Sequence, residues 1–195
     1  MKLYYDPITV NCRKVVAGLD LIGASYDDEL LNYFGGDHKL PAYKEINPNG
    51  ELPALVDDDL VLWESNAILV YASEKLGNKT AYPTDPKIRG DITRWLLWES
   101  SKWFAGCYTY LVENVVKPIL DDKPDTDLLA AHAPTFHGQA SILEARLEGR
   151  DWLCDDHPTI ADIAVAAPMH LHGAQKLPLE TYPNIRAWIA RVEAL

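Results

Sequence analysis

The feature that most constrains the fold is a change of pattern near residue 78. Before it, short stretches rich in aliphatic and aromatic residues alternate with stretches whose apolar residues recur at helical spacing. After a proline-containing segment at 79–87, only the helical spacing remains. The sequence therefore predicts an α/β domain over residues 1–78, a linker over 79–87 and an all-helical domain over 88–195.

The first domain is expected to follow the order strand, helix, strand, helical turn, strand, strand, helix. A strand over residues 2–6 is followed by a helix that begins near Cys12 and stops at Gly23. Ser65 is expected to cap the helix that ends before Gly77. The other expected elements are a strand at 25–31, a long connection with a helical turn at 35–50, and a hairpin of strands at 52–56 and 60–63.

The second domain shows four helical patterns. They are expected at 88–120, from about 127 or 133 to 147, at 160–173 and at the stripe of Ile185, Trp188, Ile189 and Val192. Thr159-Ile160-Ala161-Asp162 matches a capping box with Asp in place of Glu. Because Asp162 is the single acidic or basic residue of the helix that follows, this helix is expected at the centre of the domain.

Composition excludes several classes of protein. The formal net charge of −11 argues against binding nucleic acid or an anionic membrane through a basic patch. No apolar run approaches the ~20 residues that span a bilayer, and residues 1–10 lack the apolar core of a signal peptide. The three widely spaced cysteines suggest neither a disulfide framework nor a metal site, so we expect a reducing, cytoplasmic setting.

Thr9-Val10-Asn11-Cys12 stands where the first strand gives way to the first helix. A helix N-terminus carries unpaired N–H groups and a partial positive charge, which favour a thiolate over a thiol. Redox proteins with a Cys-x-x-Cys turn hold their reactive thiol at this place, but here a hydroxyl replaces the first sulfur. The pattern suggests that the reactive sulfur belongs to a ligand, although a plain helix cap remains an alternative.

Two later turns could bind that ligand. Pro53, immediately before a strand, suggests a cis bond that would expose the backbone of Leu52 for pairing with an extended peptide. Ser65 at a helix start would bind a carboxylate, and Glu64 would accept a hydrogen bond from a neighbouring amino group. Together they would recognise the zwitterionic end of an amino acid. Each turn alone could equally be structural.

Taken together, these turns resemble those of the glutathione transferases, and the resemblance runs from end to end. It is most specific in the segments at 47–55, 64–68, 159–163 and 182–188. It implies a thioredoxin-like N-terminal domain with a mixed four-stranded sheet, followed by an all-helical domain. It also implies a cytoplasmic homodimer that uses glutathione as co-substrate, with no tightly bound cofactor and no metal.

The resemblance also assigns roles to residues. Glu64 and Ser65 would hold the γ-glutamyl end of glutathione, and Leu52 would pair with its cysteinyl backbone. His38, with Lys39 as a second candidate, would approach the glycyl carboxylate. The full expected glutathione-binding set is His38, Glu51, Leu52, Pro53, Glu64 and Ser65.

Three residues compete for the role of activating the thiol. We favour Thr9 over Asn11, and Asn11 over Tyr5, which stands at the spacing of the catalytic tyrosine in tyrosine-type classes. The wall for a small hydrophobic electrophile is expected on the first long helix of the second domain, at Trp103, Phe104, Cys107 and Tyr108.

The leading functional hypothesis is conjugation of glutathione to an electrophile, as in detoxification. Thr9 together with Asn11 prompts a second hypothesis, glutathione-dependent reduction of disulfides or peroxides. A third is a non-catalytic member of the fold that binds partner proteins.

Overall fold

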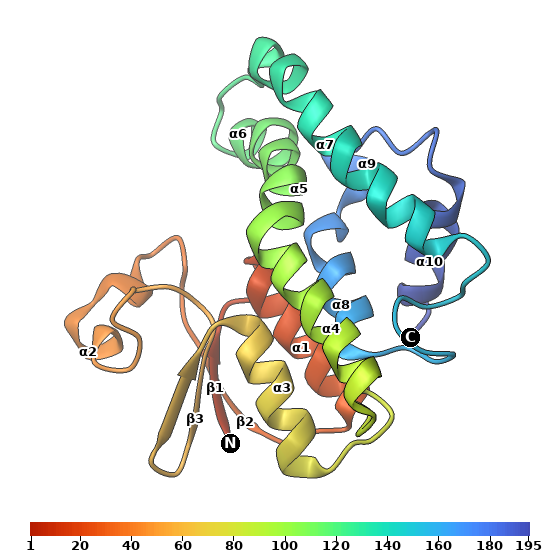
Figure 1. Ribbon diagram of the computed structural model, residues 1–195. Coiled ribbons are helices and arrows are strands. Elements are labelled where there is room, and N and C mark those ends of the chain that lie inside the picture. Colours follow the sequence, from red (N-terminus) through yellow and green to blue (C-terminus); the bar gives the residue numbers. More distant parts are fainter. The chain divides into compact units, whose positions relative to one another are not determined.

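A computed structural model describes all residues 1–195 and divides the chain into two compact units, Met1–Thr84 and Asp85–Leu195 (Figure 1). The division falls within the segment expected to be a linker, whose last two residues begin a helix. No helix combines the length and the apolar character needed to cross a membrane.

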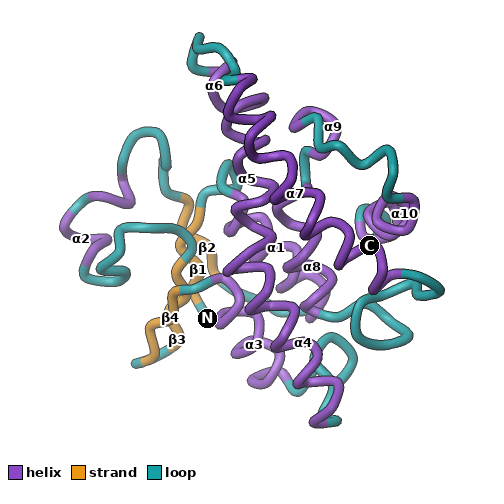
Figure 2. Tube along the Cα trace, turned by 45° about the horizontal axis from the view of Figure 1, so that its top comes forward, coloured by secondary structure: helices purple, strands orange, loops and turns teal.

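The first unit is built on one four-stranded sheet. Its order is β2-β1-β3-β4; β1 pairs with β2 in parallel, and the other neighbours are antiparallel. Figure 2 shows these strands together, with α2 on one side of the sheet and α1 and α3 on the other. The strands are β1 (Lys2–Tyr5), β2 (Asp27–Leu30), β3 (Ala54–Asp57) and β4 (Leu60–Trp63). The mixed thioredoxin-like sheet that the sequence predicted is confirmed.

Helices α1 (Val10–Ile22) and α3 (Ser65–Leu76) pack directly against each other. A Cβ atom placed on Gly18 would lie 2.3 Å from Cδ2 of Leu69, so any larger residue here would force the Leu69 side chain to move. The connection at 35–50 contains a 3-10 turn (Asp37–Lys39) and the short helix α2 (Pro41–Lys44), in agreement with the predicted helical turn.

Two expectations about this unit are corrected. The strand predicted from residue 52 begins at Ala54, because Pro53 has no N–H to donate to the sheet. Ser65 is the first helical residue of α3 and not its cap. The N-cap position belongs to Glu64, whose φ of 74° places it outside the helix.

The second unit contains helices and no strand, as predicted. Its first helical stretch runs without a break from Pro86 to Ile119, through two π-helical turns. The helix expected at 160–173 instead ends early, because Pro168 has no N–H for the next helical hydrogen bond. The helices are α4 (Pro86–Trp98), α5 (Phe104–Leu111), α6 (Lys117–Ile119), α7 (Thr126–Leu147), α8 (Ile160–Ala166), α9 (His172–Gln175) and α10 (Pro183–Val192).

The predicted capping box at the start of α8 is confirmed. The Thr159 hydroxyl accepts a hydrogen bond from the amide of Ala161, and the Asp162 carboxylate accepts one from the amide of Thr159 at 2.9 Å. The other oxygen of the fully buried Asp162 accepts hydrogen bonds from the amide of Leu153 at 2.9 Å and the indole of Trp188 at 3.0 Å. One carboxylate therefore joins α8, the segment before it and α10.

A second buried carboxylate, Asp57 at the end of β3, is expected to make the first unit sensitive to acid. The ammonium group of Lys75 and the hydroxyl of Tyr71 lower the pKa of Asp57 from 3.8 to about 2. A carboxyl group with a depressed folded-state pKa stabilises the fold above its unfolded pKa, and this contribution is lost as the pH falls toward the folded value. As the pH is lowered from 5 to about 2, the midpoint temperature of thermal unfolding should therefore fall less steeply in Asp57→Asn than in the native protein. Parallel curves would contradict this assignment.

Candidate active site

The turn between β1 and α1 uses the hydroxyl of Thr9 as a helix cap. Thr9 has extended backbone angles, and its Oγ1 accepts a hydrogen bond from the amide of Cys12 at 3.3 Å. The same hydroxyl lies 3.3 Å from the carbonyl oxygen of Asp6, to which it donates. Its hydrogen is thereby engaged within the turn, which suits a capping role.

The sulfur of Cys12 is buried beneath this turn. Cys12 is 0% exposed, and burial raises the pKa of its thiol to about 11. Its Sγ accepts a hydrogen bond from the amide of Asp6 at 3.4 Å. A protonated thiol without access to solvent is a poor nucleophile, so any reactive sulfur at this site has to come from a ligand.

Asn11 faces a small pocket into which the three turns converge. Its neighbours there include Leu52 and Pro53, which precede β3, and Glu64 and Ser65 at the start of α3. The complete lining is Asn11, Asn47, Asn49, Glu51, Leu52, Pro53, Trp63, Glu64 and Ser65. Five of the six expected glutathione-binding residues, all except His38, therefore share one pocket with Asn11.

The start of α3 provides an anion-binding element in this pocket. No side chain caps the helix, so its positive N-terminal end is available to a ligand. The hydroxyl of Ser65 lies beside it, accepts a hydrogen bond from Nζ of Lys14 at 3.1 Å and donates one to Oδ1 of Asn11 at 3.4 Å. A carboxylate bound here would meet the backbone N–H groups of the helix end and lie near an ammonium charge.

The turn before β3 provides backbone groups. The Leu52–Pro53 peptide bond is cis, as predicted, and Leu52 lies outside the sheet pairing. The preceding carbonyl of Glu51 accepts hydrogen bonds from the hydroxyl of Tyr43 at 2.7 Å and the side-chain NH₂ group of Asn47 at 2.8 Å. This support holds the turn in place, so the backbone of Leu52 can pair with an extended peptide.

Three other expected residues lie outside the pocket lining. The hydroxyl of Tyr5 donates to Asp28 at 3.3 Å, and burial raises the pKa of Tyr5, which opposes formation of a phenolate. His38 is buried and its ring stacks on that of Tyr33, with 4.5 Å between the ring centroids. Burial is the main cause that lowers the pKa of His38. The ammonium of Lys39 donates to the carbonyl of Gly50 at 2.6 Å.

The expected electrophile wall divides into two faces of one helical stretch. Trp103 and Cys107 are 0% exposed, and the Trp103 indole donates to the carbonyl of Val165 at 3.0 Å inside the helical unit. Phe104 and Tyr108 lie on the neighbouring, more exposed face, about 100° further around the helix, where their ring centroids are 5.1 Å apart. Trp103 and Cys107 therefore belong to the core, because residues four apart share a face and one face of this helix is buried. Their burial favours a role in the core, whereas Phe104 and Tyr108 stay candidates for the wall.

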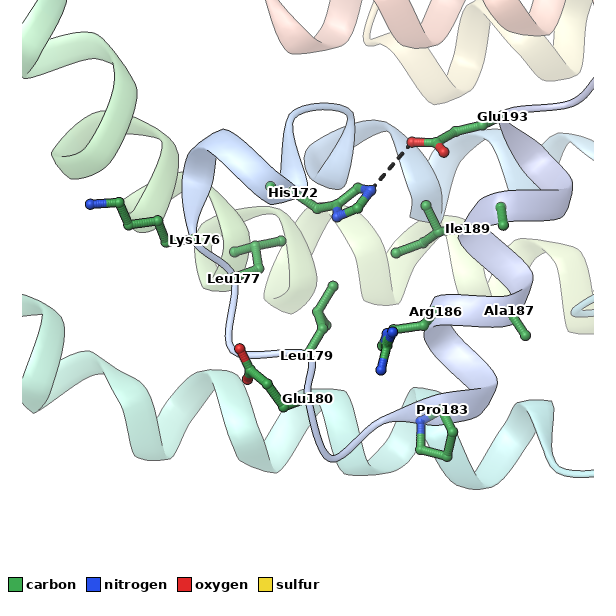
Figure 3. Close-up of a pocket in the computed structure, with 12 residues that line it drawn as sticks. His172, Lys176, Leu177, Leu179, Glu180, Pro183, Arg186, Ala187, Ile189 and Glu193 are labelled. Atoms are coloured by element: carbon green, nitrogen blue, oxygen red, sulfur yellow. Dashed lines mark ion pairs between the residues drawn. The ribbon is translucent and has the colours of Figure 1, made fainter.

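A second hollow, which the sequence did not predict, lies in the helical unit. This groove of about 920 Å³ lies between α9, the chain that follows it and α10 (Figure 3). The side chains of Leu177, Leu179 and Ile189 point into it, and an ion pair of 3.4 Å joins His172 and Glu193 along one edge. No local pattern marks the groove, since it depends on how the chain turns between the two helices.

Sequence reasoning also missed Lys14, Asn47, Asn49 and Trp63. A signal for Lys14 was present, since a charged residue interrupts the apolar face of the first helix, one turn before Gly18. The asparagines stand in a conspicuous Asn-Pro-Asn-Gly turn. Trp63 gave no signal beyond membership of a strand.

Comparison with known proteins agrees with this geometry. Residues 1–74 match the family model "Glutathione S-transferase, N-terminal domain", and residues 108–195 match "Glutathione S-transferase, C-terminal domain". The chain is 31% identical to the probable glutathione S-transferase GSTF2 of Oryza sativa subsp. japonica over 191 residues, which are 96% of this chain and 89% of the relative.

Solved structures give the same result. Human glutathione-S-transferase T1-1 superposes with a TM-score of 0.90 at 28% identity, covering 99% of this chain and 82% of that one. Glutathione S-transferase I from maize, solved with an atrazine glutathione conjugate, superposes with a TM-score of 0.87 at 25% identity, covering 99% of this chain and 92% of that one. The chain thus belongs to the glutathione S-transferase family, whose enzymes take glutathione as co-substrate and conjugate it to electrophiles.

Proposed function

We propose that the pocket around Asn11 binds glutathione and that Asn11 holds its thiolate. The convergence of three separate turns on this pocket carries the proposal. The γ-glutamyl carboxylate binds Ser65 and the start of α3, while Glu64 accepts a hydrogen bond from the ligand's amino group. The backbone of Leu52, before cis-Pro53, pairs with the cysteinyl residue, and Glu51 adjoins it. His38 and Lys39 are not part of the proposed site.

Asn11 is better placed than Thr9 for activating the sulfur. Its carbonyl oxygen accepts from Ser65, which leaves its NH₂ group as the donor toward the ligand. A free thiol has a pKa near 8.5, and a hydrogen bond to sulfur beside a helix N-terminus lowers that value. The thiolate then donates its electron pair to the electrophilic carbon, a C–S bond forms, and the leaving group departs with its own electron pair.

We propose that Phe104 and Tyr108 contact the electrophile. Their stacked rings offer an apolar surface on the exposed side of α5, and Tyr108 is 39% exposed. Such a surface favours planar, hydrophobic electrophiles. The maize enzyme was solved in complex with an atrazine glutathione conjugate, a ligand that carries an aromatic ring.

Two reactions test the proposed chemistry. We expect the protein to bind immobilised glutathione and to conjugate glutathione to chlorodinitrobenzene, as measured by the product's absorbance. Turnover of hydroxyethyl disulfide without conjugation would instead favour a reductase, which Asn11 beside a thiolate would also suit. Binding without either turnover would favour a non-catalytic member, and absence of binding would contradict the proposed site.

We also propose that the protein is a cytoplasmic homodimer. Val61 and Trp63 are each 41% exposed on the same face of the edge strand β4, and such apolar side chains suit a subunit interface. Light scattering is expected to give twice the 21.9 kDa mass of one chain, and Val61→Lys should shift the mass toward that of a monomer. The three cysteines are free, which suits a reducing compartment.

A further inference from the structure

Lys14 is a buried lysine beneath the glutathione pocket. Its side chain is 2% exposed on α1, although lysine is almost never fully buried unless it is paired. Its ammonium group donates to the hydroxyl of Ser65 at 3.1 Å. Burying a cation is costly, so a residue of this kind suggests a role in the pocket that it adjoins.

The packing of α1 on α3 determines where this ammonium group lies. Gly18 contacts Leu69 closely, and one turn earlier in both helices Lys14 meets Ser65. The two helices therefore run in the same direction, and both begin at the pocket. The helices lie close together at Gly18, and one turn nearer the pocket the Lys14 side chain spans the space between them to reach the first residue of α3.

Lys14, Ser65 and Asn11 form a chain of hydrogen bonds in which each donor and acceptor can be assigned. Since the ammonium of Lys14 has only hydrogens to donate, the oxygen of Ser65 accepts from it. The single hydroxyl hydrogen of Ser65 is then directed away from Lys14, to Oδ1 of Asn11 at 3.4 Å, which leaves an incoming carboxylate to the backbone N–H groups at the start of α3. With its carbonyl so engaged, Asn11 presents its NH₂ group to the ligand.

We propose that Lys14 is a positioning residue that couples carboxylate binding to thiol activation. It strengthens the positive potential at the start of α3 and, through Ser65, orients the amide of Asn11 toward the sulfur. This inference rests on the proposed glutathione site. It predicts that the charge of Lys14 changes both the affinity for the γ-glutamyl group and the acidity of the bound thiol.

The test compares Lys14→Met, which removes the charge at similar length, with Lys14→Arg, which keeps it. The pKa of bound glutathione is measured from thiolate absorbance as the pH is varied, and affinity is measured with S-methylglutathione, which has no thiol. In Lys14→Met we expect the thiol pKa to rise by about one unit and the affinity to fall about tenfold. In Lys14→Arg, which keeps the charge, most of the change in thiol pKa and in affinity should be absent.

Arg13→Met provides a matched control, because it removes a positive charge from the exposed neighbour on the same helix. Its thiol pKa and affinity should stay near those of the native protein. Lys14→Met removes one partner of a buried hydrogen bond, so its thermal stability should fall, and the thiol pKa and the affinity are the deciding measurements. A purely structural role predicts lower stability with an unchanged thiol pKa.

The outcomes separate this inference from the proposed function. If the native protein binds and ionises glutathione but Lys14→Met does so with the same pKa and affinity, the role of Lys14 is refuted and the proposed function stands. If the native protein neither binds nor ionises glutathione, both are refuted.

Discussion

Replacing Asn11 by Ala is expected to lower kcat/KM for conjugation about 100-fold, the usual cost of removing one preorganised donor to a reacting anion. The side chain of Asn11 lies in the pocket with Ser65 and Leu52, and its carbonyl already accepts from Ser65. Without its NH₂ group the bound thiolate loses a hydrogen bond, so the thiol pKa should rise as activity falls. Initial rates as a function of pH, with the thiolate absorbance, measure both effects.

Thr9→Ala is the comparison that decides between the two residues. Because the Thr9 hydroxyl caps α1, its loss should cost about 1 kcal/mol of unfolding free energy while most of the activity remains. If Thr9→Ala abolishes activity and Asn11→Ala does not, the hydroxyl holds the sulfur, as the residue spacing first suggested. The free energy of unfolding of Thr9→Ala, measured in urea, shows whether a loss of activity comes from a destabilised helix or from lost catalysis.

The largest loss of stability is expected for Asp162→Ala, at about 4 kcal/mol. The substitution removes a fully buried carboxylate and leaves the amides of Leu153 and Thr159 and the indole of Trp188 without their acceptor. Buried donors left without partners add their desolvation cost to the loss of the hydrogen bonds. Urea unfolding followed by tryptophan fluorescence measures the difference.

Asp85→Ala is the matched control for this effect. Asp85 also caps a helix, since its carboxylate accepts from the amide of Lys87 at 2.7 Å and from that of Ile88 at 3.3 Å, but at an exposed position. Its loss should cost about 1 kcal/mol, because water replaces the lost acceptor. Equal losses in the two variants would show that Asp162 acts as an ordinary cap and does not hold α8 and α10 together.

Local signals explain why the order of elements could be predicted. The first helix ends at Gly23 and the third at Gly77, and both glycines adopt the left-handed conformation that the sequence implied. The capping box at Thr159 and Asp162 was equally legible, because its partners are three residues apart. Boundaries shifted where proline removed an N–H, at Pro53 and Pro168.

The functional side chains were harder to assign, because their roles depend on partners distant in the sequence. Trp103 and Phe104 are adjacent and both aromatic, yet Trp103 packs in the core against Val165 and Phe104 lies on the neighbouring, half-buried face. Helical spacing shows which residues share a face but not which face is buried. For the same reason the sequence could not rank Asn11 above Thr9.

The sequence by itself determined two domains, their element order and the three turns of the proposed glutathione site, because each depends on neighbours within a few residues. Only the tertiary structure decided how these turns combine. The close packing at Gly18 and Leu69 brings Lys14 to Ser65 and Ser65 to Asn11, across more than 50 residues of chain. Such contacts depend on packing geometry, which no local pattern encodes.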